Sequence, residues 1–310
     1  MEANTFYFDW EPKLMIWLQS HLGNFWTTVL GSFSFFGEEL VIVAVLVFLY
    51  WCYDKKTGRF VALNVLTSII TGSCLKNVFL RLRPYMVHDG IKCLKPVDKT
   101  AEVGDIVAQG YSFPSLHSGN SLSLFGSVAA FCRKKAMWIF TSAVALLVGF
   151  SRVIVGNHYP TDVFVGWLIA IVNISFLGWI QKKVKNKVYL YIPLCVILLS
   201  GFFFCRTSDY FSSMGLLIGF CVGDIVEGRF VRFENTRNVP NMILRFGVGV
   251  AAFLGLNILF KLPFSEEFLA SGTLLSLTVR TVRYTVLIFI MTAVYPLSFR
   301  YFDKITEKKK

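Results

Sequence analysis

Apolar segments of similar length alternate with short basic clusters along this chain, and this alternation most constrains its fold. A helix needs about 20 residues to cross the hydrocarbon core of a bilayer. Nine segments after residue 37 are apolar and come near that length. We expect spans at about 38–53, 60–79, 115–132, 136–155, 160–180, 189–206, 209–227, 243–262 and 276–300.

The composition is typical of a polytopic membrane protein. Hydrophobic residues make up 55% of the 310 residues and charged residues only 16%, whereas soluble domains carry about 25% charged residues. The net charge of +12 could indicate nucleic acid binding, but the basic residues fall in short clusters and form no stripe. We therefore expect the bilayer, and no nucleic acid, as a partner. The seven cysteines show no paired short spacing, which argues against a disulfide framework.

The basic clusters predict the orientation of the spans. They follow the first, third, fifth and seventh spans and fill the C-terminal tail, and such an excess of Lys and Arg marks cytoplasmic connections. The clusters are Lys55, Lys56, Arg59; Arg133, Lys134, Lys135; Lys182, Lys183, Lys185, Lys187; Arg229, Arg232, Arg237, Arg245; and Arg300, Lys304, Lys308, Lys309, Lys310. We expect a multi-pass protein of the plasma membrane with a cytoplasmic C-terminus. The connections at 80–113, 151–162 and 261–275 are expected on the outer side.

Residues 12–36 differ from the spans because Lys13, Gln19 and Asn24 interrupt an apolar periodicity of helical spacing. This pattern is typical of an amphipathic helix in the membrane interface, and a first full span is the alternative. The predicted fold is all-α, a membrane helical bundle with a six-helix core, one helix of it interfacial, and four additional C-terminal transmembrane helices. We expect three parts: an N-terminal amphipathic helix at 1–37, a core with the motifs at 38–180, and an additional C-terminal bundle at 181–310.

A charged stretch between two predicted spans runs from Ser151 to Asp162. Charged groups at membrane depth are costly and indicate a functional site. His158 and Asp162 are four residues apart, and Pro160 is typical of the first turn of a following helix. The carboxylate would then lie within one turn of the imidazole, accept its Nδ1–H and leave Nε2 free to react.

Two further stretches on the same predicted side supply cations and a second imidazole. Lys76, Arg83 and Arg152 would form a site for a doubly charged phosphate, because their side chains donate to phosphoryl oxygens. Ser115 and the backbone N–H groups near His117, at a predicted helix start, would add donors and the positive end of the helix dipole.

The two histidines can divide the work of phosphoryl transfer. One would attack phosphorus, and the other would protonate the leaving oxygen. The sequence shows neither a carboxylate cluster for Mg²⁺ nor a zinc set of His and Cys, so we expect no metal and no cofactor. Cations would stabilise the charge on the equatorial phosphoryl oxygens instead.

Three motifs that contain these residues resemble the signatures of the type 2 phosphatidic acid phosphatase superfamily. The motifs are Lys76-x₆-Arg83-Pro84, Pro114-Ser115-x-His117 and Ser151-Arg152-x₅-His158-x₃-Asp162. The superfamily includes lipid phosphate phosphatases, phosphatidylglycerophosphate and undecaprenyl pyrophosphate phosphatases, sphingosine phosphate phosphatases and glucose 6-phosphatase. The resemblance covers about residues 38–180 and leaves the last four spans outside it.

The resemblance implies a role for each of these residues. His158 would be the nucleophile that forms a phosphohistidine, Asp162 would orient it, and His117 would be the general acid and later the base for water. The implied phosphate ligands are Lys76, Arg83, Ser115 and Arg152. The superfamily usually has glycine where this chain has Leu116, which keeps the N–H donor but would strain a backbone that needs a positive φ.

The sequence therefore predicts an integral-membrane, metal-independent phosphatase that cleaves a phosphomonoester or pyrophosphate, of a lipid, at the outer membrane face. The alternatives are a phosphatase for a soluble sugar phosphate and a transporter or receptor that binds a phosphorylated lipid without turnover. The additional spans would widen the bundle, line a groove or form a homo-oligomer. Arg280 and Arg283 are expected to reach lipid headgroups or pair within the protein, and the alternative is that they guide an anionic substrate.

Two other features have structural expectations. Asp224 and Glu227 are expected to pair with basic residues such as Arg229 or Arg245. The connection 80–113 is long enough to act as a lid, because long connections without regular structure are often functional.

Overall fold

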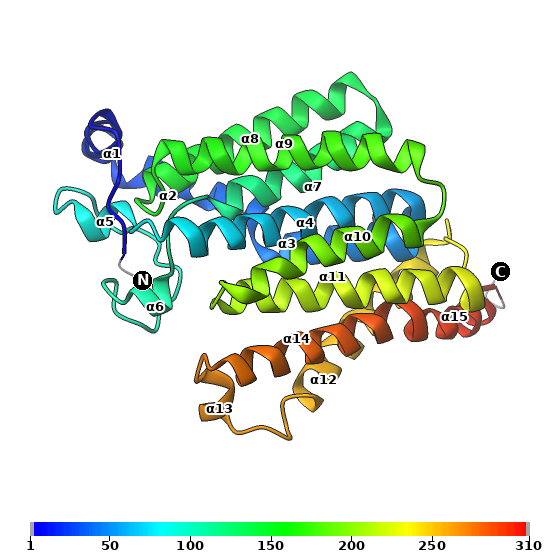
Figure 1. The fold of residues 1–310 in the computed structure, drawn as a ribbon. Coiled ribbons are helices and arrows are strands. Elements are labelled where there is room, and N and C mark those ends of the chain that lie inside the picture. The colour runs from blue at the N-terminus through cyan, green and yellow to red at the C-terminus, as the bar shows by residue number, and fades with distance from the viewer. Residues whose placement is uncertain (1–2, 308–310) are drawn as a thin grey trace. The chain divides into compact units, whose positions relative to one another are not determined.

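The computed structural model describes residues 3–307, and its regular structure is helical (Figure 1). Besides helices, the described residues contain one isolated parallel β-bridge, between Asn4 and Arg81. The prediction of an all-α fold is therefore confirmed.

The chain folds into two compact units, each built from separate stretches of sequence. The first contains residues up to Ile42 together with Thr71–Phe176, and the second contains Val43–Ile70 and the residues from Leu177 onward. All three motifs lie in the first unit. The expected division of the chain at residues 37 and 180 rests on where the motifs lie in the sequence, and it stays a prediction.

Helices of the first unit carry and surround the three motifs. They are α1 (Trp10–His21), α2 (Asn24–Ser32), η1 (Phe33–Gly37), α5 (Pro84–Val87), α6 (Ile106–Gln109), α7 (Leu116–Cys132) and α8 (Lys135–Ile154). Helices α3 (Glu39–Val47), α4 (Lys55–Phe79) and α9 (Pro160–Lys183) have residues in both units. Local chemistry sets the helix starts: Ser115 caps α7 and Asp105 caps α6 through side-chain oxygens, and Pro160 opens α9.

The second unit contains one short N-terminal helix, η2, and the helices of the C-terminal half. They are η2 (Phe48–Tyr53), α10 (Lys187–Leu199), η3 (Ser200–Phe203), α11 (Ser208–Val226), η4 (Glu227–Val231), α12 (Val239–Leu259), α13 (Glu266–Ala270), α14 (Leu274–Phe289), η5 (Ile290–Val294), η6 (Tyr295–Ser298) and α15 (Phe299–Glu307). Helices α11 and α14 pack backbone to backbone, because a Cβ at Gly215 or Gly219 would collide with the carbonyl of Thr281 or Thr285. Small residues spaced by four allow such close helix contacts in membranes.

In the part of the chain that the structure describes, five helices are long and apolar enough to cross a membrane. They are α4, α8, α9, α12 and the Leu274–Thr306 helix. The pair Asn24–Gly37 and Glu39–Tyr53, bent by 43°, makes a sixth if it is one broken span. The chain is thus a multi-pass membrane protein. The prediction of nine spans is not confirmed, because elements such as α7 and α10 are shorter than the length needed to span alone.

Residues 12–36 form two helices and a 3₁₀ turn where the sequence predicts one helix. Helix α1 stops before Leu22, whose backbone is extended, and Gly23 is extended as well before α2 begins. Because the apolar periodicity continues through this break, the hydrophobic pattern does not indicate that the helix is interrupted. That these helices lie in the membrane interface stays a prediction.

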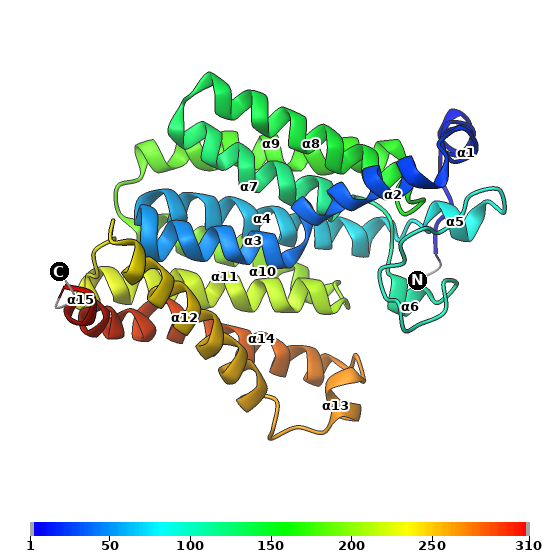
Figure 2. The same cartoon turned by 180° about the vertical axis from the view of Figure 1, so that it is seen from behind.

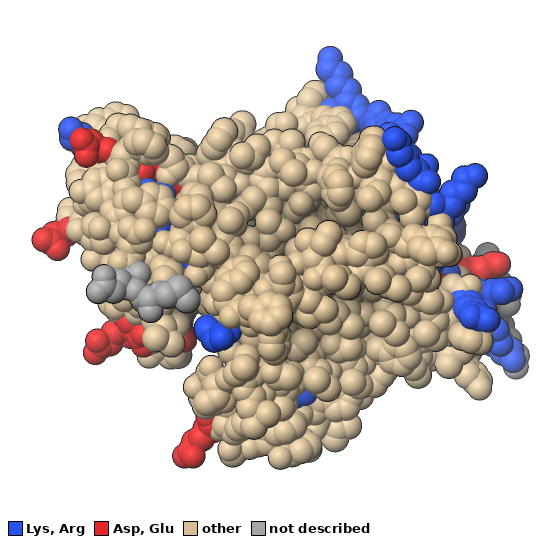
Figure 3. All heavy atoms as spheres, viewed as in Figure 1, with Lys and Arg blue, Asp and Glu red and all other residues tan. Residues whose placement is uncertain are grey.

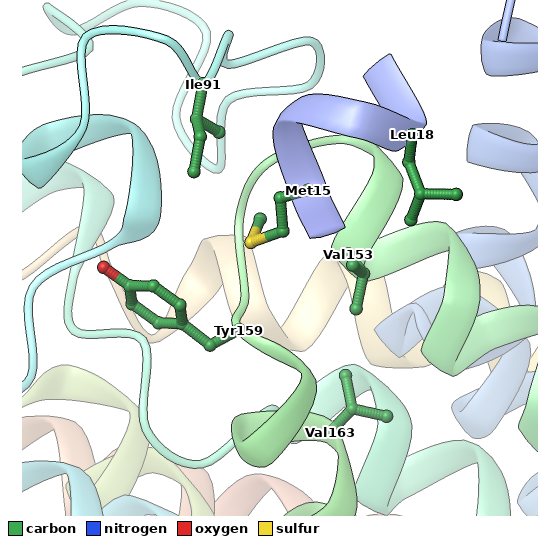
Figure 4. Packing of buried hydrophobic residues seen from close by; sticks show 6 residues of the cluster. All are labelled: Met15, Leu18, Ile91, Val153, Tyr159 and Val163. Atoms are coloured by element: carbon green, nitrogen blue, oxygen red, sulfur yellow. The ribbon is translucent and has the colours of Figure 1, made fainter. Parts of the chain in front are cut away.

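Helix α1 packs on the turn between α8 and α9. Met15 and Leu18 of α1 belong to a buried cluster with Val153, Tyr159 and Val163 (Figure 4). Because Tyr159 follows His158 directly, the N-terminal helix covers the backbone of the third motif.

Asp224 and Glu227 have different partners from those expected. Asp224 is buried and accepts hydrogen bonds from Arg59 and Lys187, each at 2.8 Å. Glu227 pairs with Lys55 at 2.6 Å. Both carboxylates thus pair with basic residues of α4 or α10, and not with the two basic residues that were named.

Charged side chains are unevenly distributed over the surface of the first unit. Figure 3 shows basic side chains at the turn between α7 and α8, and acidic side chains at the end that carries α5 and α6. The basic turn consists of the exposed residues Arg133, Lys134 and Lys135. An exposed basic cluster is what the positive-inside rule requires of a cytoplasmic connection, and the orientation itself stays a prediction.

Candidate active site

The turn between α8 and α9 carries His158. Gly156 in this turn has a left-handed backbone (φ +85°), and a Cβ there would collide with a neighbouring backbone carbonyl. The tight turn lets the N–H of His158 donate to the carbonyl of Arg152 at 3.3 Å. Helix α9 begins at Pro160, as predicted, so Asp162 lies in its first turn.

Asp162 faces the His158 imidazole from this first turn. Nδ1 of His158 and Oδ2 of Asp162 are 3.6 Å apart, and both side chains are buried. Among the residues that the structure describes, Nδ1 has no hydrogen-bond partner. Oδ2 accepts the N–H of Tyr159 at 2.8 Å. The carboxylate is therefore on the predicted side of the imidazole, at a separation slightly longer than a hydrogen bond.

The other carboxylate oxygen of Asp162 is held by Arg81, a residue that the sequence analysis missed. Nη1 of Arg81 donates to Oδ1 of Asp162 at 2.6 Å, and Nη2 donates to Oε2 of Glu11 at 2.9 Å. Oε1 of Glu11 accepts the hydroxyl and the N–H of Thr161, at 2.6 and 3.0 Å. The three charged side chains are buried. The sequence gives no local signal that pairs these two residues, because Glu11 and Arg81 each have another charged residue two positions away.

Lys76 and Arg83 also hold the connection 80–113. The ammonium of Lys76 donates to a carbonyl of this connection at 2.7 Å. The guanidinium of Arg83 donates to the carbonyl of Gln109 at 2.7 Å and to that of Asn157 at 3.1 Å. Arg83 thus ties the end of the long connection to the turn between α8 and α9. The hypothesis that this connection acts as a lid stays a prediction.

Ser115 lies buried at the start of α7 and caps this helix. Its hydroxyl lies 2.9 Å from Oγ of Ser118 and accepts the Ser118 N–H at 3.5 Å. Its own N–H donates to the carbonyl of Asp162 at 2.9 Å, which joins the second motif to the third. His117 follows in the first turn of α7, where the N–H groups of a helix start face outward.

Leu116 does not strain the start of α7. The non-glycine residues with positive φ in the described range are Leu80, Arg133 and Arg232, so Leu116 is not one of them. A Cβ added to Gly72 would lie 2.5 Å from Cδ2 of Leu116. Glycine at position 72 therefore provides the room that the leucine occupies.

Arg152 brings a buried positive charge close to His158. It is buried in the last turn of α8, and its Nε has no hydrogen-bond partner within residues 3–307. Burial is the main cause that lowers the pKa of His158 well below its usual value, followed by the charges of Arg83, Arg152, Lys76 and His117. All four side chains are thus close enough to act on this imidazole. A lowered pKa keeps His158 neutral at pH 7, with a lone pair available.

The donors near the site are cations and imidazoles. No group of three or more His, Cys, Asp and Glu in the described part of the chain could hold a metal ion. Buried cations without full compensation favour an anion, and two imidazoles beside it can exchange protons or attack an electrophilic centre. This arrangement in a membrane bundle is suited to phosphoryl transfer.

Comparison with known proteins identifies the class. Residues 56–186 match the PAP2 superfamily, and residues 211–308 match the PAP2 superfamily phosphatase, transmembrane extension. The chain therefore belongs to the PAP2 superfamily, and it is a membrane phosphatase of this superfamily.

Curated relatives include enzymes of bacteria, archaea and amoebae. The undecaprenyl-diphosphatase of Sulfolobus acidocaldarius is 33% identical over 155 residues, which are 49% of this chain and 68% of the relative. Phosphatidylglycerophosphatase B of Bacillus subtilis is 28% identical over 173 residues, 51% of this chain and 74% of the relative. A probable sphingosine-1-phosphate phosphatase of Dictyostelium discoideum is 22% identical over 243 residues, 71% of this chain and 57% of the relative. No solved structure matches the chain significantly.

Proposed function

We propose that this phosphatase hydrolyses a phosphomonoester or pyrophosphate of a lipid, without a metal ion, through a phosphohistidine on His158. The observation that carries the proposal is the position of the His158 imidazole. It lies 3.6 Å from the carboxylate of Asp162 and within the electrostatic reach of Lys76, Arg83 and Arg152. A neutral imidazole steered by a carboxylate and surrounded by cations is suited to attack a phosphoryl group.

In the first step, Nε2 of His158 attacks phosphorus and the bond from phosphorus to the leaving oxygen breaks. His117 donates a proton to that oxygen, which leaves as an alcohol or as a phosphate. The Nδ1–H of His158 faces Asp162, whose negative charge stabilises the positive charge that develops on the ring.

In the second step, water attacks the phosphohistidine. His117, now deprotonated, accepts a proton from this water, and the bond from phosphorus to Nε2 breaks. Inorganic phosphate leaves, and both histidines return to their starting states. Atoms and protons balance over the two steps with water as the only co-substrate.

The cations near the site have two kinds of role: one binds the phosphoryl oxygens, and the other holds the backbone around the site. Arg152 lacks a partner for its Nε in the described part of the chain, which supports a direct role on a phosphoryl oxygen. Lys76 and Arg83 donate to carbonyls of the connection 80–113 and the α8–α9 turn, so they would hold the walls of the site as well as contribute charge. Ser115 would act through the start of α7, because its hydroxyl caps this helix.

The membrane and the relatives support a lipid substrate. A site within a bundle of membrane helices gives acyl or prenyl chains lateral access from the bilayer. The relatives include an undecaprenyl-diphosphatase and a phosphatidylglycerophosphatase B. The basic clusters support an outward-facing site in the plasma membrane and a cytoplasmic C-terminus. A homo-oligomer formed through the C-terminal spans stays a prediction.

A hydrolysis screen in EDTA tests the proposal. The purified chain is assayed for phosphate release from phosphatidic acid, phosphatidylglycerophosphate, an isoprenyl pyrophosphate, a sphingoid base phosphate and glucose 6-phosphate. We expect turnover of one or more lipids that EDTA does not reduce, loss of activity in His158→Ala, and full activity in His21→Ala. His21 is the matched control because it is an exposed histidine in α1.

Each part of the proposal has its own contrary result. Activity that survives His158→Ala would reject the nucleophile. Strict dependence on an added divalent metal would reject the cation-based site. A preference for glucose 6-phosphate over every lipid would reject the substrate class and favour the sugar phosphate alternative.

A further inference from the structure

In the second unit, the connection that includes α13 joins α12 to α14 (Figure 2). Residues of this connection and of α14 line a basic cavity. Its volume is about 300 Å³. Its lining includes Lys261, Glu266, Leu269, Arg280, Arg283 and Tyr284. This volume is at the lower end of the range for ligand pockets, enough for a polar headgroup and too small for acyl chains.

Local contacts hold the walls of this cavity. Ser265 caps α13 by accepting the N–H of Phe268 at 3.2 Å. The rings of Phe264 and Phe268 stack with centroids 5.8 Å apart. The hydroxyl of Ser276 donates to the carbonyl of Leu269 at 3.4 Å, which ties α13 to the first turn of α14. The connection is therefore a built wall that positions its side chains.

The charges that line the cavity do not balance. Lys261, Arg280 and Arg283 contribute three positive charges, and Glu266 contributes one negative charge. Within residues 3–307, none of these four side chains forms an ion pair, and the shielded Nε of Arg283 has no hydrogen-bond partner. Like charges so close repel one another, so an anion in the cavity would relieve this repulsion.

Exposed apolar side chains adjoin the cavity on both flanking helices. Leu259 is the last residue of α12 and Leu262 follows it, Leu274 and Leu275 open α14, and all four are exposed. Exposed leucines beside helices long enough to span are expected to face lipid. A ligand that fits both features has an anionic head and an apolar body.

We propose that this cavity binds the phosphate of an anionic phospholipid, whose acyl chains lie along the exposed leucines. The guanidinium groups of Arg280 and Arg283 suit a phosphate because their paired donors match its oxygens. The lining residues include no histidine, so the lipid is bound here and not cleaved. The site gives the transmembrane extension a role that is separate from hydrolysis.

A lipid-dependent thermal shift tests this site. The full chain in neutral detergent is heated with added phosphatidylglycerol or with phosphatidylcholine of the same acyl chains. Phosphatidylglycerol is a phosphodiester and would not be consumed by a phosphomonoesterase. We expect phosphatidylglycerol to raise the Tm of the wild type by about 2–4 °C more than phosphatidylcholine does. Arg283→Gln and Lys261→Gln should each lose this difference, and Lys261 is exposed, so its substitution does not endanger folding.

Arg206→Gln is the matched control, because Arg206 is an exposed arginine on the same predicted side and does not line the cavity. It should keep the full lipid-dependent shift. Equal shifts with the two lipids in the wild type, or a loss in Arg206→Gln as large as in Arg283→Gln, would overturn the proposal. An equal rise with inorganic phosphate alone would assign the cavity to a free anion and overturn the lipid assignment.

Discussion

Nη1 of Arg81 donates a 2.6 Å hydrogen bond to Oδ1 of Asp162, so a buried cation holds the carboxylate that faces His158. The second carboxylate oxygen stays turned toward the imidazole, at 3.6 Å. Arg81 is held in turn by Glu11, which lies outside the residues that match the superfamily, 56–186. The N-terminal segment therefore contributes to the geometry of the site.

Asp162→Asn should lower kcat far more than it raises KM. The asparagine amide carries no negative charge. The His158 imidazole therefore loses the group that orients its Nδ1–H and stabilises its positively charged state. We expect kcat to fall by on the order of 10²–10⁴-fold. Steady-state kinetics on the substrate found in the screen measure the split. A large rise in KM with unchanged kcat would instead indicate a role in phosphate binding.

Glu11→Gln should destabilise the protein and lower kcat. The substitution removes the negative charge beside Arg81 and leaves one buried donor poorly satisfied, at a cost of about 1–3 kcal/mol in the free energy of unfolding. Thermal unfolding and kcat are measured together. Asp9→Asn is the control, because Asp9 is exposed and makes no side-chain hydrogen bond to the start of α1. If Glu11→Gln and Asp9→Asn had the same Tm and the same kcat, the Glu11–Arg81 hydrogen bond would have no role in stability or turnover.

The acid limb of kcat/KM should lie below about pH 6.5, the ordinary pKa of histidine. Burial and nearby positive charges lower the pKa of His158, so the imidazole stays unprotonated to a lower pH than in water. Removing one of these charges in Arg152→Gln should raise the pKa and move the limb to higher pH. A pH profile of the residual activity measures this shift. A limb that stays in place or moves to lower pH would contradict the electrostatic picture.

Gly37→Ala should reduce turnover, whereas Gly72→Ala should be tolerated. A Cβ at Gly37 would lie 2.6 Å from the carbonyl oxygen of His117, and backbone cannot move aside without displacing the imidazole. The one contact shorter than 3.4 Å that a Cβ at Gly72 would make is with a terminal methyl of Leu116, which can rotate away. Because a displacement of about 1 Å can cost 100-fold in rate, we expect a loss of about that size for Gly37→Ala alone. Similar rates for both variants would show that the contact with His117 has no catalytic consequence.

Local pattern predicted the parts of the fold that depend on neighbouring residues. The spacing of His158 and Asp162, with Pro160 between them, placed the carboxylate in the first turn of α9, and the structure has this arrangement. Ser115 was expected at a helix start and is the N-cap of α7. Both features follow from the geometry of a single helical turn.

Features that depend on distant residues could not be predicted in this way. Arg81 and Glu11 are 70 residues apart, and no local pattern pairs them. Arg59 and Asp224 are 165 residues apart. The sequence predicted partners for Asp224 that lie closer along the chain. The number of spans is not confirmed, because hydropathy marks apolar segments, whereas five or six of the described helices have both the length and the apolar composition to cross a membrane.

The most direct test of the account is to trap the covalent intermediate. With a substrate such as p-nitrophenyl phosphate, whose leaving group needs no proton, His117→Ala should slow the attack of water more than the formation of the phosphohistidine. Rapid quenching in alkali, followed by mass spectrometry, should then find a phosphate on the peptide that contains His158. The same experiment on His158→Ala should find none, and that variant should be inactive. Steady turnover with no phosphate on His158 at any quench time, or phosphate on another residue, would contradict the account.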